Sequence, residues 1–147
     1  MSFQRILCPT DFSPVAAAAL ERATMLARTF GAELILVHVV QTFAYPVFDL
    51  GLVGVMPQLQ EEQVQRARER LEQTKAGLGS GLVVRTDLRT GDAREQVLAA
   101  ARDAKADLIV MGTHGHTGLA HVLLGSTTER VVRLAECPVL TVRLPKA

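Results

Sequence analysis

Residues 33–40 have the sequence Glu-Leu-Ile-Leu-Val-His-Val-Val, a nearly continuous apolar run rich in β-branched side chains. The run lacks the alternation of polar and apolar positions that a half-exposed strand shows. Strands of this composition are typical of parallel sheets that carry helices on both faces. The stretch therefore predicts a central strand of a parallel α/β sheet.

Outward from this run, predicted strands alternate with predicted helices along the whole chain. Strands are expected at 5–9, 33–40, 82–88, 107–111 and 138–143, and helices at 15–30, 58–75, 92–104 and 126–136, of which 58–75 is charged and solvent-facing. Such alternation predicts right-handed crossovers and a doubly wound five-stranded parallel sheet with helices on both faces. The expected strand order is 3-2-1-4-5.

Helix boundaries are marked by residues with known capping preferences. Ser13 is expected to be the N-cap of the first helix, with Pro14 at its first position, and Gly31 to end it. Asp92 and Glu95 have the spacing of a capping box, in which each side chain accepts a hydrogen bond from the other residue's backbone N–H.

Composition and charge narrow the class of protein. The 147 residues predict a single domain, residues 1–147, and the formal net charge of +1 disfavours binding to nucleic acid. No basic segment precedes a long apolar run near the start, so neither export nor a membrane span is expected. Two cysteines, Cys8 and Cys137, indicate a reducing compartment, hence a cytoplasmic protein.

Ligands of doubly wound sheets bind beyond the carboxyl ends of the strands, where the winding reverses. With the order 3-2-1-4-5, the reversal lies between the first and fourth strands. The loops that meet there are residues 9–11 and the segment that begins at Gly112.

Glycines gather in this second loop, which has the sequence Gly-Thr-His-Gly-His-Thr-Gly-Leu-Ala-His-Val-Leu-Leu-Gly-Ser-Thr-Thr-Glu over residues 112–129. Glycine lets the backbone approach a phosphate closely, and successive N–H groups can form an anion-binding nest. Gly125 and Ser126 stand where a helix begins, so free amides and the positive end of the helix dipole would face the same space. A simpler role is a capping box between Ser126 and Glu129, and the two roles are compatible.

Gly112-x-x-Gly115, followed after nine residues by Gly125-Ser126, resembles the ATP-binding signature of the universal stress protein family. Residues 6–13 resemble the opening strand and loop of that family, residues 37–39 its second strand and residues 137–142 its last. The resemblance implies a Rossmann-like fold of the adenine nucleotide alpha hydrolase-like type.

The resemblance also implies a set of nucleotide-binding residues. Adenine and ribose would lie against Pro9, Thr10, Asp11 and Val39, the ribose and phosphates against Met111, Gly112, His114, Gly115 and His116, and the terminal phosphates against Gly125, Ser126 and Thr127. His116 stands where many relatives carry Arg or Lys, and a histidine supplies only part of a charge near neutral pH. Phosphate affinity is therefore expected to depend on backbone amides, to weaken as the pH rises, and to leave a role for a divalent cation such as Mg or Mn.

By the same resemblance, the chain is expected to be an ATP-binding sensor or switch of the stress response that pairs into a homodimer through Val139–Val142. Residues 112–126 contain no Lys, Arg, Asp or Glu, so hydrolysis should be slow or absent. Two other functions stay open: a slow ATPase or adenylyl-transferring enzyme, and a nucleotide-independent interaction module. The apolar residues 42–56 could pack on their own subunit, close over the nucleotide, join the dimer interface or contact a protein partner.

Two further sites are less favoured by the sequence. His114, His116 and His121 share one loop, but no nearby Cys or carboxylate completes a zinc site. Asp11 could place a magnesium ion, although hydrogen bonding to ribose hydroxyls is preferred. His38 lies within an apolar strand, where a hydrogen-bonded structural role is expected.

Overall fold

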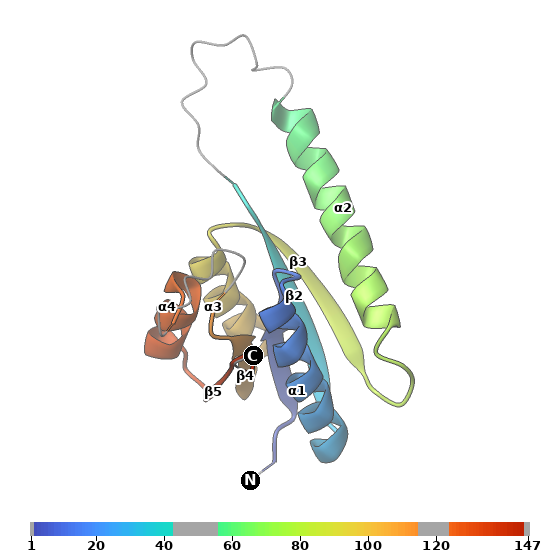
Figure 1. Cartoon of the computed structure of the whole chain (residues 1–147), viewed down its shortest axis with the longest axis vertical. Coiled ribbons are helices and arrows are strands. Elements are labelled where there is room, and N and C mark those ends of the chain that lie inside the picture. Colours follow the sequence, from blue (N-terminus) through green and yellow to red (C-terminus); the bar gives the residue numbers. More distant parts are fainter. Residues whose placement is uncertain (1, 43–55, 115–123, 146–147) are drawn as a thin grey trace.

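The computed structural model describes residues 2–42, 56–114 and 124–145. Five parallel strands form one sheet in the predicted order β3-β2-β1-β4-β5. The strands are β1 (Arg5–Pro9), β2 (Glu33–Gln41), β3 (Val84–Gly91), β4 (Leu108–Gly112) and β5 (Val139–Val142). Helices α1 (Pro14–Phe30), α2 (Met56–Ala76), α3 (Ala93–Ala104) and α4 (Ser126–Leu134) alternate with them (Figure 1).

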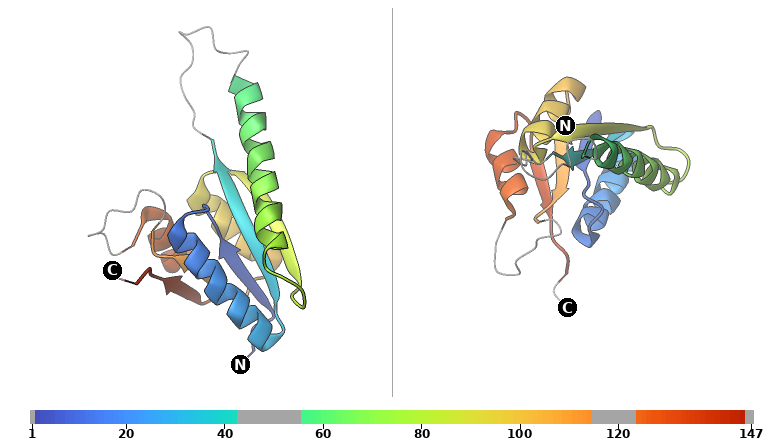
Figure 2. Two further views of the ribbon diagram at one scale, coloured as in Figure 1. Left: turned by 45° about the vertical axis from the view of Figure 1, so that its right-hand side comes forward. Right: turned by 90° about the horizontal axis from the view of Figure 1, so that it is seen from above.

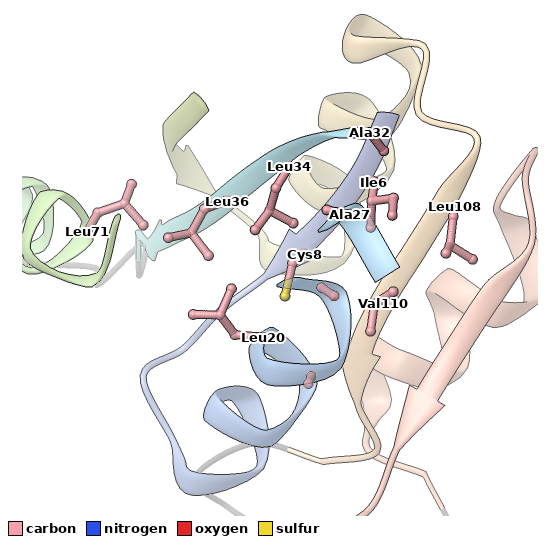
Figure 3. Packing of buried hydrophobic residues seen from close by; sticks show 12 residues of the cluster. Ile6, Cys8, Leu20, Ala27, Ala32, Leu34, Leu36, Leu71, Leu108 and Val110 are labelled. Carbon is pink, nitrogen blue, oxygen red and sulfur yellow. The ribbon is translucent and has the colours of Figure 1, made fainter. Parts of the chain in front are cut away.

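Helices cover both faces of the sheet, and α1 and α2 lie on one face while α3 and α4 lie on the other (Figure 2). Alternate side chains of the central strands enter two separate clusters. Ile6, Cys8, Leu34, Leu36, Leu108 and Val110 pack with α1 and with Leu71 of α2 (Figure 3), while Leu7, Ile35, Val37, Ile109 and Met111 pack with α3 and with Val131 of α4. The period of two along each strand therefore builds a core on both faces.

The winding of the sheet reverses on either side of β1. β1 pairs with β2 along its length, so that Pro9 lies opposite Val37, and it pairs with β4 through Ile6 and Leu7. The loop after β1 and the segment after β4 thus begin next to each other at the carboxyl edge, as the predicted order requires.

Three of the predicted helix ends are confirmed. Ser13 caps α1 by accepting a hydrogen bond from the N–H of Ala16 at 3.2 Å, and Gly31 ends the helix with φ at +65°. Asp92 caps α3 through the N–H groups of Arg94 and Glu95. The reciprocal half of that capping box is wrong, because Glu95 instead accepts a hydrogen bond from Arg130 of α4 at 2.6 Å.

Several predicted boundaries differ from the structure by one to three residues, and two have a clear cause. β3 was expected at 82–88 but runs over Val84–Gly91, because Arg89, Thr90 and Gly91 continue to pair with β2. α4 was expected to reach Glu136 but ends at Leu134. Its C-cap, Ala135, already has an extended backbone with φ at −66° and ψ at 142°, so the chain leaves the helix earlier and turns toward β5.

α2 is mostly exposed, as its charged sequence predicted, although it begins at Met56 rather than at residue 58. Ala67 and Leu71 are its buried side chains among the described residues. The helix extends past the end of β1 (Figure 1). None of the helices in the described parts of the chain is long and apolar enough to cross a membrane.

Adding a single methyl group at Gly112 should destabilise the fold. A Cβ at this position would overlap Cγ1 of Val15 and lie 3.3 Å from the Val15 carbonyl carbon, both in α1. We expect Gly112→Ala to lower the free energy of unfolding by about 1–3 kcal/mol, since overpacking forces backbone and side chains apart. Urea unfolding measures the change.

Gly77→Ala is the matched control, because a Cβ there meets only carbonyl oxygens at ordinary contact distances of 3.5 and 3.6 Å. It should leave stability unchanged or raise it by up to about 1 kcal/mol. Equal effects of the two substitutions would contradict the packing account.

Candidate functional site

A pocket lies at the carboxyl edge of the sheet, where the winding reverses between β1 and β4. Its walls come from the ends of three strands, from the loop after β1, and from the first turns of α1, α3 and α4. The lining residues are Pro9, Thr10, Asp11, Ala16, Val37, His38, Val39, Gln41, Ala93, Val97, Met111, Gly112, His114, Thr127 and Thr128. This position matches the location that the strand order predicted.

The pocket brings together most of the residues singled out in the sequence. Pro9, Thr10, Asp11, Val39, Met111, Gly112, His114 and Thr127 all line it. Gly125 and Ser126 lie at the start of α4 but do not line the pocket. Gly115 and His116 lie outside the described residues, as does most of the apolar segment 42–56.

Two of the glycines have roles in packing and hydrogen bonding, in addition to the contact with a phosphate that the sequence predicts. Gly112 leaves room for Val15 of α1. Gly125 donates its backbone N–H to the Thr113 carbonyl at 2.6 Å, and a Cβ there would lie 3.3 Å from the His114 Cα. Gly125 therefore joins the two ends of the glycine-rich segment, and its own amide is already engaged.

The first turn of α4 differs from those of α1 and α3. Gly125 is the N-cap, and no side chain of the described residues caps the helix, so the expected capping role of Ser126 is wrong. The first intrahelical bond runs from Glu129 N–H to Gly125 C=O, which leaves the N–H groups of Ser126, Thr127 and Thr128 without an acceptor inside the helix. Thr127 and Thr128 line the pocket, so the positive end of this helix borders it.

α3 also begins at the pocket, but its N-terminus is satisfied by its own cap. Hydrogen bonds from Arg94 and from the backbone N–H of Glu95 hold the pKa of Asp92 at about 2. The carboxylate is thus charged at neutral pH and accepts hydrogen bonds from two N–H groups of the first turn, those of Arg94 and Glu95.

The backbone of Val39 presents a donor and an acceptor toward the pocket. In β2, Glu33 N–H bonds to Gln4 and Val37 C=O accepts from Thr10, whereas Leu34 N–H bonds to Val83 before β3. Odd-numbered residues of β2 therefore face β1 and even-numbered residues face β3. Because β1 ends opposite Val37, the N–H and C=O of Val39 project into the space beyond β1.

The loop after β1 is held by short side-chain contacts. Thr10 Oγ1 accepts a hydrogen bond from Phe12 N–H at 3.0 Å, and Asp11 Oδ1 accepts one from Ser13 N–H at 3.0 Å. Thr10 and Ser13 are almost fully buried, while Asp11 is half-buried at the pocket. The loop thus carries a carboxylate at a defined position on the pocket wall.

Sequence reasoning missed the part of the pocket that comes from α3 and from the end of β2. Ala93 and Val97 lie one turn apart on α3, and Gln41 follows Val39 by two residues on the same side of β2. Their spacing is that of an ordinary helix face and an ordinary strand. Only the packing of α3 against β2 makes them pocket residues.

His38 is hydrogen-bonded, as expected, but it also borders the pocket. Its Nδ1 lies 2.7 Å from the Thr10 carbonyl oxygen. A carbonyl can only accept, so Nδ1 carries a proton. Burial lowers the pKa of His38 and outweighs the opposing effects of the Thr10 hydrogen bond and Asp11, while Arg70 lowers it further.

Within the described residues, no three His, Cys, Asp or Glu side chains are grouped so that they could hold a metal ion. His116 and His121 fall outside those residues. His114 Nδ1 lies 3.0 Å from Thr113 Oγ1.

These features define a doubly wound α/β protein with a pocket at the reversal point of its sheet. The family model of the universal stress protein family matches residues 2–143. The chain belongs to the universal stress protein family.

Individual relatives span nearly the whole chain. The universal stress protein MJ0531 of Methanocaldococcus jannaschii is 37% identical over 145 residues, covering 98% of this chain and 84% of its own length. The solved structure of MJ0577 superimposes with a TM-score of 0.87 at 30% identity, covering 100% of both chains. UspA from Lactobacillus plantarum gives a TM-score of 0.85 at 28% identity, covering 97% of this chain and 99% of its own.

Two more distant structures share the fold and contain nucleotides. A universal stress protein in complex with cAMP has a TM-score of 0.64 at 23% identity and covers 97% of this chain and 98% of its own. A family protein from Arabidopsis thaliana with AMP bound has a TM-score of 0.63 at 19% identity, with 97% and 92% covered.

The lowered pKa of His38 should make stability depend on pH. The unfolded chain takes up a proton near the usual value of 6.5, whereas the folded chain does so only at lower pH. The contribution of His38 is therefore complete above about pH 6.5 and decreases as the pH falls through this window. We expect the free energy of unfolding, measured in urea from about pH 7 to about pH 5, to show this loss.

His38→Asn is the informative comparison, because an amide can donate to Thr10 as Nδ1 does but does not titrate. The difference in unfolding free energy between wild type and this variant should shrink as the pH falls. If the unfolding free energies of wild type and His38→Asn changed with pH in parallel, the prediction of a lowered His38 pKa would be contradicted.

Proposed function

We propose that the pocket binds ATP and that the protein acts as a nucleotide-dependent switch in the stress response. The observation that supports this best is that one pocket combines the Val39 backbone edge with the first turn of α4, which no side chain of the described residues caps. The first suits a base, and the second suits a phosphate. The cAMP and AMP complexes of the distant family members are consistent with an adenine nucleotide.

The base would lie at the β2 end of the pocket. Adenine has an amino donor beside the N1 acceptor, and the C=O and N–H of Val39 offer the complementary pair on one strand edge. Val37, Val97 and Met111 provide the apolar surroundings that a base requires. Asp11 would accept hydrogen bonds from the ribose hydroxyls, and Pro9 and Thr10 would flank the sugar.

The phosphates would lie at the start of α4. The N–H groups of Ser126, Thr127 and Thr128 are oriented as an anion site requires, and the Thr127 side chain adds a hydroxyl. His114 borders the same region, and Gly115 and His116 complete the proposed set. A Mg or Mn ion on the phosphates would supply the charge that the described pocket side chains lack.

Slow hydrolysis follows from the same chemistry. None of the described residues that line the pocket is a Lys or Arg, so no guanidinium or ammonium neutralises the charge that develops during phosphoryl transfer. A nucleotide that persists can shift the population of conformations or partners, as a switch requires. We include in the proposal a cytoplasmic location, consistent with the two free cysteines.

We also propose a homodimer formed through β5 and a protein contact at residues 42–56. β5 is an edge strand, and Leu140 on it is 41% exposed. Edge strands of this apolarity are usually covered.

The first test is mass spectrometry of the purified protein before and after denaturation, together with calorimetric titration by MgATP. Release of an adenine nucleotide, or binding of added ATP in preference to GTP, is the expected result. A protein that releases no nucleotide and ignores added ATP would overturn the proposal. Accumulation of ADP over the titration would favour the slow enzyme over the switch.

Asp11→Asn tests the proposed ribose contact. The amide oxygen can still accept from Ser13 N–H, so the loop should hold, while one charged acceptor is lost. We expect ATP affinity to fall on the order of tenfold, the value of one hydrogen bond to a charged group. Glu136→Gln, an exposed carboxylate beyond the end of α4, is the control and should bind as wild type does.

A further inference from the structure

Two consecutive side chains of the loop after β1 have different surroundings. Asp11 lines the pocket at the carboxyl edge of the sheet. Phe12 packs against the cluster on the side of α1 and α2. Between them the backbone is unusual, because Phe12 has φ at +63°, the left-handed region that residues with a side chain rarely adopt. The direction of Asp11 therefore depends on whatever holds Phe12 in place.

The ring of Phe12 has two specific neighbours. The ring of His38 lies with its centroid 4.6 Å away and its plane tilted by 40°. The guanidinium carbon of Arg70 lies 4.5 Å from the Phe12 centroid, within the range of a cation–π interaction. His38 is itself bonded to the Thr10 carbonyl, so it belongs to the pocket wall.

Arg70 belongs to α2, and none of the described residues that line the pocket comes from that helix. Ala67 and Leu71 are the buried residues of α2 in the described part of the chain, and they anchor this helix to the sheet. They lie on either side of Arg70 in the sequence. The position of the guanidinium over Phe12 is thus set by the packing of α2 against β2 and β3. A helix outside the pocket touches the residue whose backbone sets the pocket loop.

We propose that Arg70, acting through Phe12, is a positioning residue for the pocket. Its contact keeps Phe12 in the left-handed conformation, and this orients Asp11 toward the ligand. The inference rests on the proposed function in so far as the ligand is a nucleotide, whereas the effect on the loop is independent of any ligand.

The coupling must act in both directions. If the contact of Arg70 with Phe12 improves the affinity of the pocket, a ligand on Asp11 stabilises the same contact by an equal factor. α2 then responds to occupancy of a pocket that it does not line. This helix is the element through which binding is communicated to the surface on the α1 and α2 side of the sheet.

The test uses Arg70→Met, which keeps an apolar stem and removes the cation, with Arg70→Lys as the conservative variant. Arg66→Met is the matched control, since Arg66 lies one turn earlier on α2 and pairs only with the exposed Glu62 among the described residues. Calorimetry measures the affinity for MgATP, and hydrogen exchange measures the amides of Phe12 and Ser13, whose acceptors are Thr10 Oγ1 and Asp11 Oδ1.

Arg70→Met should weaken MgATP binding about two- to fivefold, the value of one cation–π contact. It should also speed exchange at Phe12 and Ser13 while leaving the amides of β1 and β2 unchanged. Arg70→Lys should retain most of the affinity, and Arg66→Met should match wild type. In wild type, MgATP should slow exchange in α2 around residues 67–71.

If Arg70 only stabilised the fold, Arg70→Met would instead speed hydrogen exchange throughout the sheet. Unchanged affinity in Arg70→Met, or an affinity loss without faster exchange at Phe12 and Ser13, overturns the inference. If wild type binds no nucleotide, the proposed function fails, and the exchange of these two amides still decides whether Arg70 positions the loop.

Discussion

The pairing of β1 with β2 on one side and β4 on the other is the constraint on which the rest of the structure depends. Backbone hydrogen bonds in both directions place β1 at the point where the chain reverses its winding. Since β1 stops at Pro9 while β2 continues to Gln41, an unpaired strand edge remains beside the reversal point. The pocket is a consequence of that difference in strand length.

The three helices that begin at the pocket differ in how the backbone N–H groups of their first turns are capped. α1 and α3 are capped by their own residues, Ser13 and Asp92, and so contribute walls. α4 follows Gly125, which has no side chain to cap it and whose N–H closes the preceding loop on Thr113. Among the described residues no side chain caps this helix end, and a helix N-terminus of this kind can accept an anion.

Local sequence was a good guide where a single residue type decides the backbone. Ser13, Pro14 and Gly31 marked the ends of α1 correctly, because capping depends on a few neighbouring atoms. The same reasoning was wrong for Ser126, because Gly125 is the N-cap of α4. It was also wrong for the Glu95 half of the Asp92 capping box, because Glu95 accepts a hydrogen bond from the distant Arg130 instead. Gly112 also has a packing role that the local sequence does not reveal, since it leaves space for Val15 of α1, which is far away in the sequence.

The sequence by itself determined the parallel α/β class, the strand order, the family and the loops that meet at the carboxyl edge. These features depend on hydrophobic periodicity, on turn residues and on the spacing of glycines, all of which are local properties of the sequence. The tertiary structure decided the rest. The contributions of Ala93, Val97 and Gln41 to the pocket, and the contact of Arg70 with Phe12, depend on how α2 and α3 pack across β2. Such contacts join residues with ordinary local patterns, so no local signal distinguishes them before the helices are placed on the sheet.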